Sequence, residues 1–187
     1  MSAGPHRSAL RRGVRLAAHG LTAAALATSA IAVAGGPASA DPNGTTTANA
    51  AVLSGITLTA LTASFTLTGT PGATVATGTP VTYNVETNNV TGYTVTVQSA
   101  TALMLPSNPV TNTDSIPIGV LKVRETGTTG YTPVTALGVG TAVLVHTQTV
   151  RSADGGDALS TDFQMRIPTV KADTYRATLN YLAATPL

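Results

Sequence analysis

The chain has 187 residues, no cysteine and no tryptophan, which excludes disulfide bridges, thiol catalysis and metal sites built on thiolates. Its formal net charge is +2, but four of the ten basic residues lie in the first fifteen positions. The rest of the chain therefore holds six basic and eight acidic residues, a formal charge of −2, and without a basic cluster we expect no nucleic-acid partner.

The first forty residues have the pattern of a secretory signal peptide. A basic region is followed by a fourteen-residue apolar run, residues 21–34, and then by Ala38-Ser39-Ala40. A basic region, a short apolar core and small residues before the cut define such a signal, so we expect cleavage between Ala40 and Asp41. The alternative is a transmembrane helix, but a bilayer requires about 20 apolar residues. We therefore expect a mature chain without a transmembrane segment.

Cleavage leaves 147 residues, the length of a single domain. Residues 41–51 are small and polar and predict a flexible leader, and residues 52–187 predict one β domain. Arg11-Arg12 leaves the twin-arginine export route open beside general secretion.

From residue 52 onward, apolar and polar residues alternate with a period of two, which is typical of half-buried strands. The runs that predict strands are 56–60, 64–68, 81–86, 93–98, 116–123, 142–150, 162–167 and 174–183. Gly, Pro, Asn, Asp and Thr predict turns or loops at 69–80, 88–89, 126–130, 152–160 and 171–174.

No segment of the mature chain has the periodicity of an amphipathic helix. Abundant Thr and Val favour strands as well. Seven to nine short strands predict an all-β fold, an antiparallel Ig-like β-sandwich, with a closed barrel as the alternative.

His146 is the single histidine after the signal peptide. A Ser-His-Asp triad would need it, but the chain has no G-x-S-x-G motif and the residue lies within a strand-like run. One imidazole also cannot form a His-rich zinc shell. We therefore predict that His146 has a structural or surface position and that the protein is not an enzyme.

Asp154-Gly-Gly-Asp157, with Asp162 nearby, is the one acidic concentration. Carboxylates near a Gly-rich turn are a weak candidate for Ca²⁺ binding, although the spacing is not that of an EF-hand and DGG is also an ordinary turn. A glycosidase pair would need two of them across a cleft, and no Trp offers a sugar platform. We therefore predict no cofactor.

The last predicted strand resembles a known family. Residues 174–183 read TYRATLNYLA, and Pro186 follows closely. This segment is similar to the closing strand of bacterial cell-surface WxL domains, with Tyr181 where the signature Trp stands and Ala183 where a Leu stands. The resemblance implies a secreted β-sandwich that associates with the cell wall without a covalent bond, and it makes Tyr181 a candidate wall or partner contact.

These observations together favour a non-enzymatic, secreted surface, structural or adhesion protein, whose partner is peptidoglycan or another surface protein. The alternative is a soluble extracellular module that binds a carbohydrate or a protein.

Overall fold

The computed structural model describes residues 44–186, and almost all regular structure in them is β-strand. The one helical segment among these residues is a 3-10 turn at Ile118–Val120. All named strand pairs are antiparallel, which confirms the all-β prediction. No helix in the described range is long and apolar enough to cross a membrane. The predicted signal peptide and cleavage residues Ala38, Ala40 and Asp41 lie outside the described residues.

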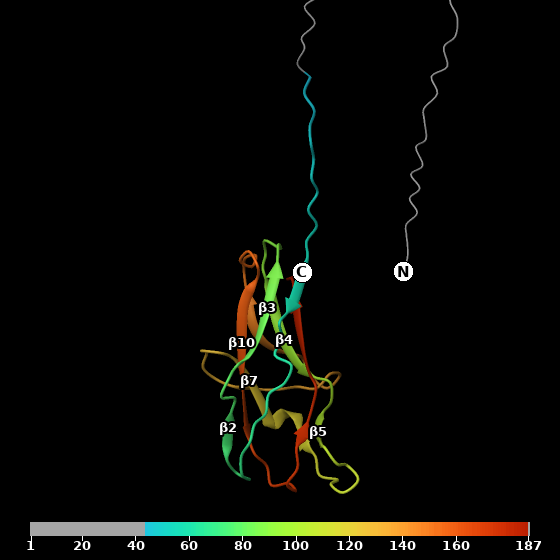
Figure 1. The fold of residues 1–187 in the computed structure, drawn as a ribbon, viewed down its shortest axis with the longest axis vertical. Coiled ribbons are helices and arrows are strands. Elements are labelled where there is room, and N and C mark those ends of the chain that lie inside the picture. The colour runs from blue at the N-terminus through green and yellow to red at the C-terminus, as the bar shows by residue number, and fades with distance from the viewer. Residues whose placement is uncertain (1–43, 187) are drawn as a thin grey trace, which may run out of the picture. The chain divides into compact units, whose positions relative to one another are not determined.

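The β domain lies in the compact unit that begins at Asn49, and its largest sheet has six strands. They follow the order β1-β3-β10-β7-β8, and β2 also pairs with β10 (Figure 1). Their bounds are β1 Ile56–Thr59, β2 Thr74–Ala76, β3 Val81–Thr87, β7 Leu121–Glu125, β8 Thr132–Pro133 and β10 Asp157–Arg166.

Two three-stranded sheets complete the domain, in the orders β12-β4-β9 and β11-β5-β6. Their bounds are β4 Tyr93–Ser99, β5 Leu103–Pro106, β6 Ile116–Pro117, β9 Val143–Gln148, β11 Tyr175–Arg176 and β12 Leu179–Ala184. The described residues thus contain twelve strands rather than the predicted seven to nine. The prediction was wrong here for two reasons: the runs 116–123 and 174–183 each divide into two strands, and the short strands β2, β5 and β8 form outside the predicted runs.

One core lies between the six-stranded sheet and the sheet β12-β4-β9, in a sandwich-like arrangement. Tyr83 of the larger sheet packs against Tyr181 of the smaller one, with ring centroids 5.2 Å apart. Alternating side chains of β3 and β4 are buried, as period two requires. Phe163, in the middle of β10, is fully buried and stacks on Phe65 at 4.4 Å.

In two segments the sequence predicted correctly which side chains are buried, but not which residues form a strand. Phe65 and Leu67 are half-buried on one side as predicted, but residues 64–68 form no strand. The predicted strand 174–183 alternates throughout, yet it divides at Ala177-Thr178 into β11 and β12, which belong to different sheets. Burial alone therefore produces the alternation, whereas the hydrogen-bond partner decides where a strand ends.

A β-bulge in the pair β4–β9 sets the direction of His146. The register shifts between Val95 and Thr96, which lie opposite His146 and Leu144 respectively, so that Val145 is the extra residue. Because a bulge places two successive side chains towards one face, Val145 and His146 both point into the protein. Without the shift, alternation from Val143 would direct His146 outwards.

Gly92, just before β4, is a position where a side chain is excluded. Its φ is +82°, and a Cβ there would overlap the backbone carbonyl oxygen of Gln148. We expect Gly127→Ala, with φ +83° but open space around it, to lower the free energy of unfolding by about 1–2 kcal/mol. Gly92→Ala should cost about 1 kcal/mol or more beyond that, because the clash is added. Urea unfolding of both variants checks this, and equal losses would show that no clash occurs.

Candidate functional site

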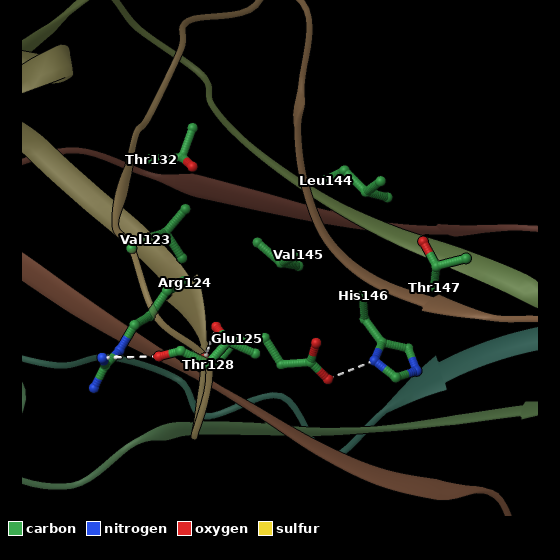
Figure 2. A pocket seen from close by; sticks show the side chains of 10 residues that line it. Val123, Arg124, Glu125, Thr128, Thr132, Leu144, Val145, His146 and Thr147 are labelled. Atoms are coloured by element: carbon green, nitrogen blue, oxygen red, sulfur yellow. Dashed lines mark hydrogen bonds and ion pairs between the residues drawn. The ribbon is translucent and has the colours of Figure 1, made fainter.

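An open groove of about 380 Å³ lies between β7 and β9, at the side where the two main sheets meet. Three consecutive residues of β7 and four of β9 line it, together with residues of the following turn (Figure 2). Leu144 is exposed at the groove, whereas Val123 and Val145 belong to the core. The groove places the charged side chains of Arg124 and Glu125 beside His146, which makes it a candidate site.

His146 and Glu125 join the two walls of the groove. The Nδ1 atom of His146 lies 2.6 Å from Oε1 of Glu125, and Figure 2 shows the two side chains pointing towards one another. Nε2 of His146 is buried without a hydrogen-bond partner among residues 44–186, and the His146 ring packs against that of Tyr93 at 5.6 Å. The described hydrogen bonds of His146 include no serine or threonine hydroxyl. This arrangement fits the structural alternative for His146, in which the pair connects β9 to β7.

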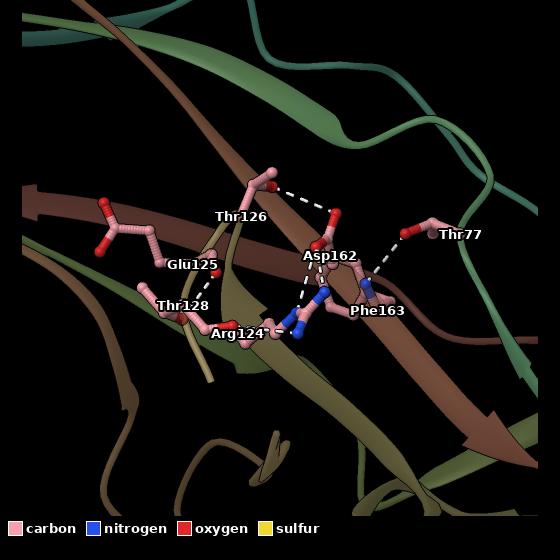
Figure 3. A network of polar contacts seen from close by, with 7 residues as sticks. All are labelled: Thr77, Arg124, Glu125, Thr126, Thr128, Asp162 and Phe163. Atoms are coloured by element: carbon pink, nitrogen blue, oxygen red, sulfur yellow. Dashed lines mark hydrogen bonds and ion pairs between the residues drawn. The ribbon is translucent and has the colours of Figure 1, made fainter. Parts of the chain in front are cut away.

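A second polar network lies along β7 and β10 (Figure 3). Nε and Nη2 of Arg124 donate to Oδ2 of Asp162 at 3.1 and 3.0 Å, and Thr126 donates to Oδ1. Nη1 of Arg124 donates to the carbonyl oxygen of Thr128, and its guanidinium lies 4.5 Å above the Tyr131 ring. Arg124 is therefore committed to internal partners and has little capacity left for a ligand.

The three aspartates of the calcium candidate have separate partners. Asp162 pairs with Arg124, and Asp157 accepts hydrogen bonds from Tyr93 Oη at 2.6 Å and from the Ala153 amide. Asp154 is exposed, 3.5 Å from Arg151. Among residues 44–186, no three His, Cys, Asp or Glu side chains come together as metal ligands usually do. The loop predicted at 152–160 covers only residues 152–156, because β10 begins at Asp157.

The positions of these carboxylates lead us to expect no calcium effect on stability. Adding Ca²⁺ or EDTA should leave the melting temperature unchanged within error, because Asp157 and Asp162 each have a direct partner. A thermal-shift titration measures this. A calcium-dependent rise that Asp154→Asn abolishes would contradict it.

Asp162→Asn should destabilise the domain by about 1.5–3 kcal/mol, because it leaves the Arg124 guanidinium without its counter-charge at a site that is largely buried. Asp154→Asn is the matched control, since its ion pair with Arg151 is exposed to solvent and should contribute almost nothing. Chemical unfolding compares the two variants. A similar loss of free energy of unfolding in both would show that the Asp162–Arg124 pair contributes no more than the exposed pair does.

Tyr181 faces the interior rather than the surface. Its hydroxyl lies 2.6 Å from Oγ1 of Thr161, a contact that joins β12 to the opposite sheet. Burial raises the pKa of Tyr181 to about 12, although the hydrogen bond to Thr161 opposes this. Tyr83 and Tyr93 also have raised pKa values, mainly because of burial. The wall-contact role of Tyr181 stays a prediction, and its phenol already has internal partners.

Sequence reasoning did not find the Arg124–Asp162 pair or the pairing of His146 with Glu125. Arg124 and Asp162 stand directly opposite one another in the register of β7 and β10. Asp162 begins one predicted strand and Arg124 directly follows another, but only the register of β7 and β10 brings the two charges together.

No protein-family model matches the chain, and no curated protein matches its sequence. The resemblance of residues 174–183 to the WxL closing strand therefore stays a prediction.

Proposed function

We propose that the protein is a secreted, non-enzymatic surface or matrix protein that works by contact, with peptidoglycan or another surface protein as its partner. The observation that carries this proposal is the internal pairing of the groove's charged side chains. Arg124 is bound to Asp162, and Glu125 is bound to His146. Catalysis needs groups whose protonation or nucleophilicity is free to change at a substrate, and these pairs instead stabilise the packing of strands.

The shape of the groove also supports contact rather than capture of a small molecule. Sites for small ligands bury most of the ligand surface in an enclosed pocket. The groove between β7 and β9 is open to solvent. Export by the predicted signal peptide at residues 1–40 places this contact outside the cell.

We further propose that the domain is an Ig-like sandwich related to the WxL domains. The core shared by two antiparallel sheets supports it. The strand order departs from the constant-type immunoglobulin pattern, because β9 lies in the smaller sheet and β10 lies between β3 and β7 in the larger one. Tyr181 at the position of the signature Trp is half-buried, which supports a packing role for that position.

A pulldown of the exported protein with purified, insoluble peptidoglycan tests the wall contact. We expect the protein in the pellet and its release by high salt or detergent, because the association is non-covalent. Fractionation of the producing cells makes the same comparison between wall-bound and released protein on the cells themselves. Protein found wholly in the supernatant in both experiments would overturn the wall proposal.

The alternative, a soluble module that binds a carbohydrate or protein, is favoured by the size of the groove. Leu144→Arg, in the groove wall, should abolish binding to such a ligand. Leu182→Arg is the matched control, because Leu182 is similarly exposed on the same sheet but does not line the groove. Wall binding that only Leu144→Arg removes would assign the contact to the groove.

A further inference from the structure

Four aliphatic side chains protrude from one end of the β domain. Val52, Leu53, Val90 and Val150 have exposed fractions of 82, 85, 77 and 55%. They come from three segments: the chain before β1, the β3–β4 turn and the β9–β10 loop. We call these four residues the loop-tip patch. Large apolar side chains that are grouped and exposed on a protein surface usually mark a place of contact.

Hydrogen bonds through the end of β3 hold the three segments together. The side chain of Asn88 donates to the carbonyl oxygen of Leu53 and accepts from the amide of Gly55, both at 2.8 Å. Thr87 exchanges hydrogen bonds with Ser152, whose hydroxyl accepts from the Thr87 amide at 2.9 Å. Figure 1 shows the corresponding turn, loop and leading segment at the same end of the domain. The apolar tips are therefore presented by a braced scaffold.

The form of the loop-tip patch fits a lipid bilayer better than a protein partner. The side chains of Val52, Leu53 and Val90 are mostly exposed to solvent. They protrude singly and do not form a continuous flat surface. A protein interface needs close packing and shape complementarity around its central residues, whereas acyl chains adapt to single protruding side chains. Charge does not oppose insertion of the leading segment, since no charged residue occurs from Pro42 to Val85.

The sequence connects this end of the domain to the predicted signal peptide. Seventeen residues, 35–51, separate the apolar run of the predicted signal peptide from Val52. Fully extended, they would reach roughly 60 Å at most. While the signal is in the bilayer, the loop-tip patch is therefore held within reach of the same bilayer.

We propose that the loop-tip patch inserts into the outer surface of a lipid bilayer and orients the domain with this end towards the membrane. Arg151, beside Val150 and with 63% of its side chain exposed, is placed to meet lipid phosphate, although Asp154 at 3.5 Å partly neutralises it. Insertion is therefore driven by apolar side chains and depends weakly on lipid charge. The proposal rests on the export assumed in the proposed function.

Vesicle flotation of the exported chain tests this contact, with phosphatidylcholine vesicles and with vesicles that also contain phosphatidylglycerol. We expect binding to both. Leu53→Ser combined with Val90→Ser should weaken partitioning at least about tenfold, because two inserted side chains are lost. The matched control is Leu105→Ser with Val110→Ser, two exposed aliphatic residues in and after β5, at the other end of the domain. It should change partitioning less than about twofold.

Circular dichroism confirms that each double variant is folded. Absence of vesicle binding by the unsubstituted chain, or an equal loss in both double variants, would overturn the proposal. So would a dimer, seen by light scattering, that only the loop-tip substitutions dissociate, because the occupant would then be a second copy. A chain that binds peptidoglycan but no vesicles overturns the bilayer contact alone, and one that binds vesicles but no wall overturns only the wall contact.

Discussion

Phe163→Ala should lower the free energy of unfolding by about 3–5 kcal/mol, a large part of the stability of a domain of this size. Phe163 is fully buried on β10, which pairs with β2, β3 and β7, and its ring stacks on Phe65. Alanine would remove the apolar contact and leave a cavity that neighbouring strands cannot close without breaking their pairing. Denaturant unfolding followed by circular dichroism measures the loss.

Leu182→Ala is the control for this prediction, since Leu182 is 63% exposed and its removal should change stability by less than about 0.5 kcal/mol. A double-mutant cycle with Phe65→Ala should give a coupling of about 0.5–1.5 kcal/mol for the stacked rings. A loss below about 1 kcal/mol for Phe163→Ala would contradict the central position of this residue in the core.

The second large effect is expected at alkaline pH. Burial raises the pKa of Tyr181 to about 12 from an ordinary value of 10.0, so the folded state keeps its proton more strongly than the unfolded state does. Its contribution is fully present below pH 10 and is lost as the pH rises towards 12. This residue alone should account for about 2–3 kcal/mol over that interval. Tyr83 and Tyr93, whose pKa values are also raised, act in the same direction.

We therefore expect the domain to unfold cooperatively as the pH rises from 10 to 12, and the buried tyrosines to ionise together with that transition. Tyrosinate absorbance and circular dichroism, recorded on one sample, follow both events, and the absence of Trp simplifies the absorbance. Tyr181→Phe should be less stable at neutral pH, because it loses the Thr161 contact, but its stability should fall less steeply above pH 10. Full ionisation of the tyrosines while the strands remain intact would contradict the assignment.

Alternation in the sequence was sufficient to predict the strands that carry the core. The segments around Tyr83, Tyr93 and Phe163 form strands with the predicted inward faces. The short strand β2 was missed because Thr74–Ala76 lies among Gly, Pro and Thr, and its pairing with β10 involves residues about 90 positions away. Local patterns predict which side chains are buried, but they do not predict which strands pair through their backbones.

The candidate site could not be predicted for the same reason. His146 was correctly taken to lie in a strand, but the bulge that turns it towards Glu125 depends on the register with β4. Asp162 was grouped with Asp154 and Asp157 because they are close in sequence, whereas the fold pairs it with Arg124, 38 positions away. Proximity along a strand is a poor guide, since successive side chains point to opposite faces.

The bulge in β9 also changes the edge of its sheet. A Thr- and Val-rich chain without disulfides is at risk of adding strands from neighbouring copies along any straight, unpaired sheet edge. β9 lies at the edge of its sheet, and the shift opposite Val95-Thr96 breaks the even spacing of backbone groups that such an addition needs. At the edge of the larger sheet, β8 is two residues long and includes Pro133, which has no amide proton to donate. The irregularity that positions His146 thus also makes the β9 edge a poor template for a strand from another copy.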